Sequence, residues 1–342
     1  MPGGARLPIT ALATAATIIA SQTLIAGAFS LAHQAVQLGY LPRLTVVHTS
    51  RRLPGQIYIP EVNWTLLAAV LALVLGFRAS VALAAAYGAT VIGTMLTTSL
   101  LFYRVTRVRW RWSAGRAAAI AGAFVLIDAV LLAGNLGKLL HGAWVPLAIG
   151  GALFAVMTTW RRGSESLAAK IAAESPTVEE FLDALRRARR PRLPGTGAFL
   201  TPDPRRIPAE LHHAAERLHV VYRRIVLLSV LTADVPRVPE RRRVHVRARG
   251  NGLWQVVATY GFAQTPSWPD LLHACPDPWM RERLERAVYI LGRTTILPTG
   301  RVRMARWRKR LFAFLWRNAR PAAAAFRIPS PQVVELGMEV EL

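Results

Sequence analysis

The chain has 342 residues, of which 53% are hydrophobic, and it carries 43 lysines and arginines against 19 acidic residues, a net charge of +24. Its first half contains apolar segments too long for the core of a soluble domain, which excludes an entirely soluble protein. The high apolar content also excludes a disordered chain, and the single cysteine, Cys275, excludes a disulfide-stabilised scaffold.

Long apolar runs predict a transmembrane domain over residues 1–160. A membrane-spanning helix needs about 20 apolar residues, with a range of about 17–25. The sequence contains five runs near this length, at about 7–32, 62–77, 79–103, 117–137 and 139–160, of which the 62–77 run is slightly short. A cleaved signal peptide is the alternative interpretation of the first run. The length of that run and the four spans that follow it favour a membrane span.

The distribution of arginines between the loops predicts the orientation. The 43–61 loop carries three arginines, the 104–116 loop carries five, and Arg161 and Arg162 follow the last run. Because positively charged loops stay on the cytoplasmic side, we expect a multi-pass protein of the cell membrane, a bacterial inner membrane. Its N-terminus would lie outside, and residues 161–342 would form a cytoplasmic domain.

Two stripes of polar side chains occur within the predicted spans. Hydroxyls recur on one face of the first helix at 10, 14, 17 and 21, and on one face of the third at 87, 90, 94 and 97. Hydroxyl and amide oxygens can replace the hydration shell of a monovalent cation. The alternative is that they bond to carbonyls of their own helix or of neighbouring helices. The candidates for an ion pathway are Thr14, Thr17, Ser21, Gln22, Tyr87 and Thr94.

Asp128 is the one acidic residue well inside a predicted span. A carboxyl group at membrane depth is costly, so its presence indicates an ion path or a proton relay. Asn135 follows seven residues later, on the same face of the predicted helix, and joins the candidates. The alternative is a structural hydrogen bond from Asp128 to a neighbouring helix.

Residues 161–342 predict a small α+β domain. The expected elements, in order, are a helix at 161–190, a strand at 197–200, a helix at 209–221, a strand at 225–231, a hairpin at 244–260, a helix from Pro269, strands near 287–297, a basic helix at 303–318 and a last strand from Val333. Glycine-rich phosphate loops and zinc-binding spacings are absent from the sequence, so we expect no enzyme, no cofactor and no metal site. The basic helix favours membrane lipid over nucleic acid as its partner.

In the membrane half, the segments IIASQTLIAGAFSLAHQAVQLGYLPRLTVVHTS (18–50), GQIYIPEVNW (55–64) and IDAVLLAGNLGKLLHGAWVPL (127–147) closely resemble the KUP/HAK/KT family of potassium uptake transporters. In the second half they include LTADVPRVPE (231–240), YGFAQTPSWPDLL (260–272) and YILGRTTILPT (289–299). The resemblance covers nearly the whole chain from about residue 10.

This resemblance implies a partial inverted-repeat transporter of the amino acid–polyamine–organocation type, with K⁺ as substrate and K⁺/H⁺ symport as the activity. Family members look like twelve-span proteins, and this chain resembles only the last five spans and the cytosolic tail. The expected partner is therefore a missing N-terminal half, and the chain is expected to be inactive alone. A homodimer is another assembly that the sequence leaves open. The competing hypothesis is a membrane-anchored regulatory or interaction protein without transport of its own.

Overall fold

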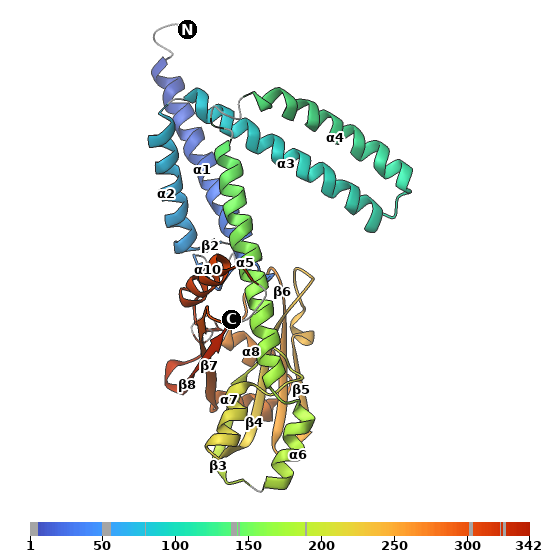
Figure 1. The fold of residues 1–342 in the computed structure, drawn as a ribbon, viewed down its shortest axis with the longest axis vertical. Coiled ribbons are helices and arrows are strands. Elements are labelled where there is room, and N and C mark those ends of the chain that lie inside the picture. The colour runs from blue at the N-terminus through green and yellow to red at the C-terminus, as the bar shows by residue number, and fades with distance from the viewer. Residues whose placement is uncertain are drawn as a thin grey trace. The chain divides into compact units, whose positions relative to one another are not determined.

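A computed structural model describes residues 6–49, 56–78, 80–137, 142, 144–188, 190–300, 304–321, 323 and 326–342 (Figure 1). The chain divides into two compact units. One contains residues 1–62 together with 157–342, and the other contains residues 63–156.

Five long helices account for most of the predicted transmembrane domain. They are α1 (Arg6–Gln37), α2 (Pro60–Phe77), α3 (Ser80–Val108), α4 (Ala114–Leu136) and α5 (Trp144–Glu174). Within the described residues, α1, α2 and residues 114–135 of α4 are long and apolar enough to cross a membrane. The count of five spans therefore stays a prediction, and the first residues of the fifth predicted run, 139–141 and 143, lie outside the described residues.

Several helices continue beyond the apolar runs that predicted them. The third run ends before Arg104, but α3 continues to Val108, and α5 passes Arg161 and Arg162 without a break. Arginine is a good helix former, so a charge that ends an apolar run does not end the helix. The residues predicted as one helix at 161–190 belong to two helices. The helical conformation is interrupted at Ser175–Pro176, between α5 and α6 (Val178–Ala188).

The helices α3 and α4 form an antiparallel pair with small residues at their contact. Ala117 and Ala121 of α4 are buried, as is Thr106 of α3, so the two backbones can approach closely. At the closed end of the pair, the Phe102 ring lies edge-on to the ring of Phe124, with centroids 6.0 Å apart. This aromatic contact helps to fix the alignment of one helix along the other.

The second half of the chain forms a six-stranded mixed sheet. The strands are β3 (Arg192–Leu200), β4 (Val221–Ala233), β5 (Val244–Gly250), β6 (Leu253–Gly261), β7 (Val288–Leu297) and β8 (Val333–Glu341). Their spatial order is β5-β6-β4-β3-β7-β8, so β5 and β8 are the outer strands. The β5–β6 pair is antiparallel, and the other four neighbouring pairs are parallel.

Helices connect the parallel strands, as that geometry requires. The connecting helices are α7 (Ala209–Arg217), α8 (Trp268–Ala274), α9 (Pro278–Glu285) and α10 (Arg306–Arg317). The remaining short elements are the strands β1 (Val47–His48) and β2 (Ile57–Tyr58) and the 3₁₀ helices η3 (Glu240–Arg242) and η4 (Ser330–Gln332). The α+β prediction therefore holds for the element types, but it did not anticipate a mainly parallel sheet.

The predicted hairpin is present at the predicted turn. Gly250, Asn251 and Gly252 all have positive φ, the left-handed conformation that glycine and asparagine adopt most readily. The helix predicted at 209–221 is shorter, because α7 ends at Arg217 and Val221 already begins β4. The expected strands near 287–297 are one continuous strand, β7.

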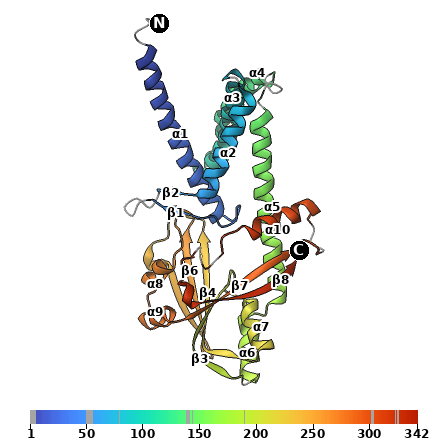
Figure 2. The same cartoon turned by 90° about the vertical axis from the view of Figure 1, so that its left-hand side faces the viewer.

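Helices cover both faces of the sheet, α8 and α9 on one and α6 and α7 on the other (Figure 2), and a hydrophobic layer lies under each set. On one face, α8 and α9 contribute Leu271 and Met280 to a core that includes Tyr289 of β7. On the other face, α6 and α7 contribute Phe181 and Leu211. Burial of these two layers stabilises the domain, since apolar area removed from water contributes about 25 cal/mol per Å².

Glu210 is a buried acid in this domain, and it gives the domain a pH-dependent stability. Burial raises the pKa of its carboxyl group, which lies over Gly292 of β7. The folded protein thus holds this proton more tightly than the unfolded chain does. The contribution of this carboxyl group to the free energy of unfolding is complete at pH values below its pKa in the unfolded chain. The contribution is lost as the pH rises through the higher pKa of the group in the folded protein.

We therefore expect Glu210→Gln, which cannot ionise, to raise the melting temperature of the domain at neutral pH. The same substitution should change the melting temperature much less at acidic pH, where Glu210 is already protonated. Thermal melting followed by circular dichroism at the two pH values measures this difference. An equal change at both would show that the carboxyl group is not the source of the pH dependence.

Candidate functional site

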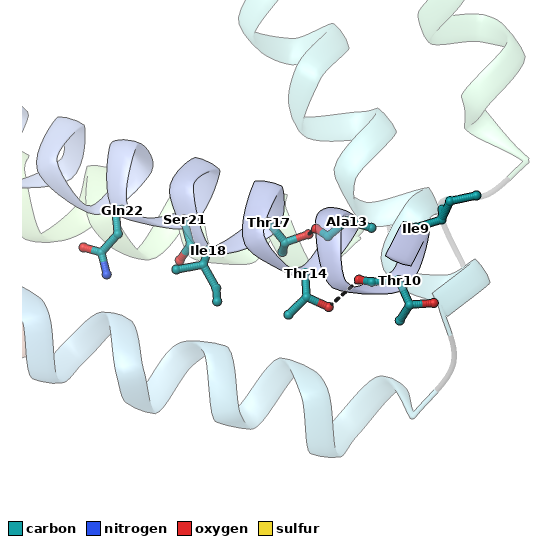
Figure 3. A pocket seen from close by; sticks show the side chains of 8 residues that line it. All are labelled: Ile9, Thr10, Ala13, Thr14, Thr17, Ile18, Ser21 and Gln22. Atoms are coloured by element: carbon teal, nitrogen blue, oxygen red, sulfur yellow. Dashed lines mark hydrogen bonds between the residues drawn. The ribbon is translucent and has the colours of Figure 1, made fainter. Parts of the chain in front are cut away.

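The polar stripe of the first helix lines an open groove on α1. The groove has a volume of about 700 Å³, and its eight lining residues all belong to that helix (Figure 3). They include the four predicted candidates Thr14, Thr17, Ser21 and Gln22. The groove is thus one polar wall, formed by a single helix.

The threonine hydroxyls on α1 bond to their own helix. Oγ1 of Thr14 donates to the carbonyl of Thr10 at 2.9 Å, and Oγ1 of Thr17 donates to the carbonyl of Ala13 at 2.8 Å. This is the structural alternative that the sequence left open. A hydroxyl oxygen that donates its proton backward still carries lone pairs that can face a cation. A role of this stripe in an ion pathway stays a prediction.

The stripe on α3 has the same character. Oγ1 of Thr94 donates to the carbonyl of Thr90 at 2.9 Å, and Thr94 is exposed. Tyr87 is also exposed, with 73% of its surface accessible. Its ring and the Thr94 hydroxyl therefore form part of an open helix surface.

Asp128 is a buried acidic residue of the α3–α4 pair. It is 3% exposed, and its Oδ2 accepts a hydrogen bond of 2.6 Å from the hydroxyl of Ser99 on α3. The structural alternative for Asp128, a bond to a neighbouring helix, is therefore present.

Asn135 also faces α3, as its seven-residue separation from Asp128 predicts. Its Nδ2 donates to the carbonyl of Leu131 at 2.9 Å. Its Oδ1 lies close to Gly88 of α3, where a Cβ atom would come within 3.6 Å of it. Asp128 and Asn135 thus place two polar side chains along one helix contact.

Ser99 is the residue that the sequence interpretation missed. It lies seven residues after Ile92 and seven before Thr106, and both of these are buried. This heptad spacing marks the face of α3 that packs on α4. A search for hydroxyls on that face, rather than on the most polar face, would have found the partner of Asp128.

The predicted candidates are divided between the two units. The four candidates on α1 belong to one unit, and the four on α3 and α4 belong to the other. Across the described part of the chain, the side chains of histidine, cysteine, aspartate and glutamate form no group of three or more that could hold a metal ion.

Comparison with known proteins gives a match over both halves of the chain. Residues 1–165 match the family model described as K⁺ potassium transporter integral membrane domain. Residues 194–342 match the one described as K⁺ potassium transporter C-terminal domain. The chain belongs to the KUP family of potassium transporters. The family members that it matches are transporters, and the chain is a membrane protein.

Similar KUP proteins occur in several bacteria under the name probable potassium transport system protein Kup. The protein of Anaeromyxobacter sp. (strain Fw109-5) is 45% identical over 100% of this chain and 52% of its own length. That of Myxococcus xanthus is 45% identical over 98% of this chain and 51% of its own length. Kup 2 of Chromobacterium violaceum is 42% identical over 100% of this chain and 55% of its own length.

The chain spans about half the length of the curated relatives that it matches. No solved structure gives a significant match to it. The KUP membership confirms the resemblance that the sequence motifs indicated. It leaves the transporter architecture of the amino acid–polyamine–organocation type as an expectation.

Proposed function

We propose that residues 1–342 contribute to potassium uptake across a bacterial inner membrane, by K⁺/H⁺ symport. In this proposal the chain works together with protein segments that correspond to the unmatched half of its relatives. The observation that carries the proposal is the consecutive match of the membrane domain and the C-terminal domain of one transporter family. The names of the relatives, which state potassium transport, support the choice of ion.

A hybrid protein tests this proposal. The part of the Myxococcus xanthus relative that this chain does not match would be joined ahead of residues 1–342. Expressed in a bacterium that lacks potassium uptake systems, the hybrid should restore growth on low-potassium medium. The intact relative is the positive control. Failure of a well-expressed hybrid would favour the competing function, a membrane-anchored regulatory protein.

The orientation is part of the proposal. Because arginine-rich loops tend to stay on the cytoplasmic side, they support an N-terminus outside and a C-terminal domain in the cytoplasm. A reporter enzyme that is active only in the cytoplasm should therefore be active when fused after Leu342. It should be inactive when fused before Arg6. The opposite pair of results would reverse the orientation.

A role for Asp128 in the proton-coupled step follows from the same proposal. Asp128→Asn keeps an oxygen that can accept the Ser99 hydrogen bond, but the amide cannot take up and release a proton as a carboxyl group can. We expect this substitution in the hybrid to lower potassium uptake at acidic pH by about tenfold or more, because a proton-transfer group contributes at least that much. Uptake of a potassium analogue as a function of pH measures the effect.

Ser99→Ala is the matched control for Asp128→Asn. It removes the hydrogen-bond donor and keeps the carboxyl group, so the shape of the pH profile should be retained. If the Asp128→Asn hybrid is expressed normally and shows the same pH profile as the unmodified hybrid, Asp128 serves helix packing instead.

A further inference from the structure

The helix α10 has two chemically different faces. Its inner face holds Phe312, which is fully buried, and Ala313, which is 8% exposed. Its outer face carries two large exposed rings seven residues apart, Trp307 and Phe314, which are 57% and 61% exposed. Rings at this spacing lie on one side of a helix.

Basic residues surround the two exposed rings. Arg306, Arg310 and Arg317 are all exposed on α10, at positions that follow the same side of the helix. The sequence contains no acidic residue between Glu285 and Glu335, so nothing in this segment offsets their charge. Arg301 and Arg303, which the sequence also placed in the basic helix, lie outside the described residues.

The inner face fixes α10 against the part of α5 where its apolar run ends. The Phe312 ring lies 5.3 Å from the Trp160 ring and packs over Gly163, where a Cβ atom would clash with it. Arg308 of α10 donates hydrogen bonds of 2.8 Å to the hydroxyls of Thr158 and Thr159. These contacts hold α10 to within about one turn of Arg161 on α5.

On the predicted fifth span, Arg161 and Arg162 would mark the level of the membrane surface on α5. Residues 144–160 contain no charged side chain, and the arginine pair follows immediately. A helix packed on residues 158–163 therefore lies at the level of the lipid headgroups. A second contact lies beyond α10, where the backbone N–H of Arg320 donates a hydrogen bond to the carbonyl of Arg43. Arg43 is the first charged residue after the apolar run of α1, so this contact is expected at the same membrane level.

We propose that the outer face of α10 binds the headgroups of anionic phospholipids in the cytoplasmic leaflet, with Trp307 and Phe314 inserted among them. Exposed aromatic rings flanked by arginines are the features of helices that lie in the membrane interface. The positive charge of the face complements the negative charge of that leaflet. The interaction holds α10, and through Phe312 and Trp160 also α5, at the surface. It rests on the membrane location of the chain and not on its transport activity.

A fluorescent label on α10 tests the proposal in the full chain. Because Cys275 is 1% exposed, the cysteine of a Phe314→Cys variant can be labelled selectively with an apolar, environment-sensitive dye. The protein would be placed in nanodiscs of phosphatidylcholine alone or of a one-to-one mixture with phosphatidylglycerol. A spin label on lipid headgroups should quench the dye about threefold more strongly in the anionic discs than in the neutral ones.

The comparison position is Leu218→Cys, an exposed site between α7 and the amino end of β4. Because β4, β7 and β8 run in the same direction and α10 packs near the carboxyl ends of β7 and β8, this site lies at the opposite end of the strands. A dye there should stay accessible to aqueous acrylamide and show no difference between the two discs. Equal quenching of the two dyes, or equal quenching in both discs, would overturn the proposal.

A charge-matched pair of variants separates the local effect from net charge. Replacing Arg306, Arg310 and Arg317 by glutamine should remove about half or more of the excess quenching in anionic discs. Replacing the exposed Arg186, Arg187 and Arg217 of α6 and α7 by glutamine removes the same charge and should leave the quenching unchanged. Equal losses in the two variants would contradict a specific lipid-binding face. Protection of the dye by added RNA in place of anionic lipid would assign the face to nucleic acid.

Discussion

Residues 1–342 expressed on their own should leave a potassium-uptake-deficient bacterium unable to grow on low-potassium medium. A cation crossing a bilayer needs a polar path that is closed on all sides, because exposed polar groups in lipid are costly. The groove on α1 is open and is lined by that helix alone. The missing walls would come from segments such as the broken helices that coordinate ions in inverted-repeat transporters.

The uptake rate in this experiment should stay at the background of the empty vector. The hybrid described above serves as its positive control, since it adds candidate walls to the same residues. A reporter fused after Leu342 would verify that the chain is present in the membrane. Growth restored by residues 1–342 without a partner chain would show that the α1 groove is closed in some other way, with a second copy of the chain as the first candidate.

Phe312→Ala should lower the free energy of unfolding of the C-terminal domain by about 3–5 kcal/mol, the usual effect of removing a buried phenylalanine ring. The ring is fully buried between Trp160 and Trp316, with centroids 5.3 and 5.8 Å away. Loss of the Phe312 ring leaves a cavity where α10 meets α5, and this should release α10 from that contact. Urea unfolding of the detergent-solubilised chain, followed by circular dichroism, measures the change.

Phe314→Ala is the matched control on the same helix. Its ring is 61% exposed, so the substitution should change the free energy of unfolding by no more than about 0.5 kcal/mol in detergent. If the two substitutions lower the urea midpoint equally, α10 does not pack through the Phe312 face.

Local patterns predicted most of the elements but little of their arrangement. Apolar runs located the long helices, and the sequence Gly250-Asn251-Gly252 located the hairpin, because both signals depend on neighbouring residues. The sheet order could not be predicted in this way. It depends on pairs such as Gly197 with Val288, which are far apart in the chain and meet only when both faces of the sheet are packed.

The candidate site shows the same limit. The face of α4 that carries Asp128 and Asn135 followed from their spacing, and the structure places both side chains toward α3. Ser99 was not predicted, because which residue of α3 lies opposite Asp128 depends on how the two helices align. That alignment is set by contacts such as the Phe102–Phe124 pair, which no single helical pattern contains.

The outer strands of the sheet carry opposite charges, and this limits how copies of the domain can meet. β5 presents Arg247 and Arg249, whereas β8 presents Glu335 and Glu339. Symmetric pairing of two β5 strands would oppose arginines, and pairing of two β8 strands would oppose glutamates, so both are repulsive. Only β5 against β8 attracts, and that head-to-tail contact does not close into a dimer. The charges therefore protect the domain from symmetric edge-to-edge association on a crowded membrane surface.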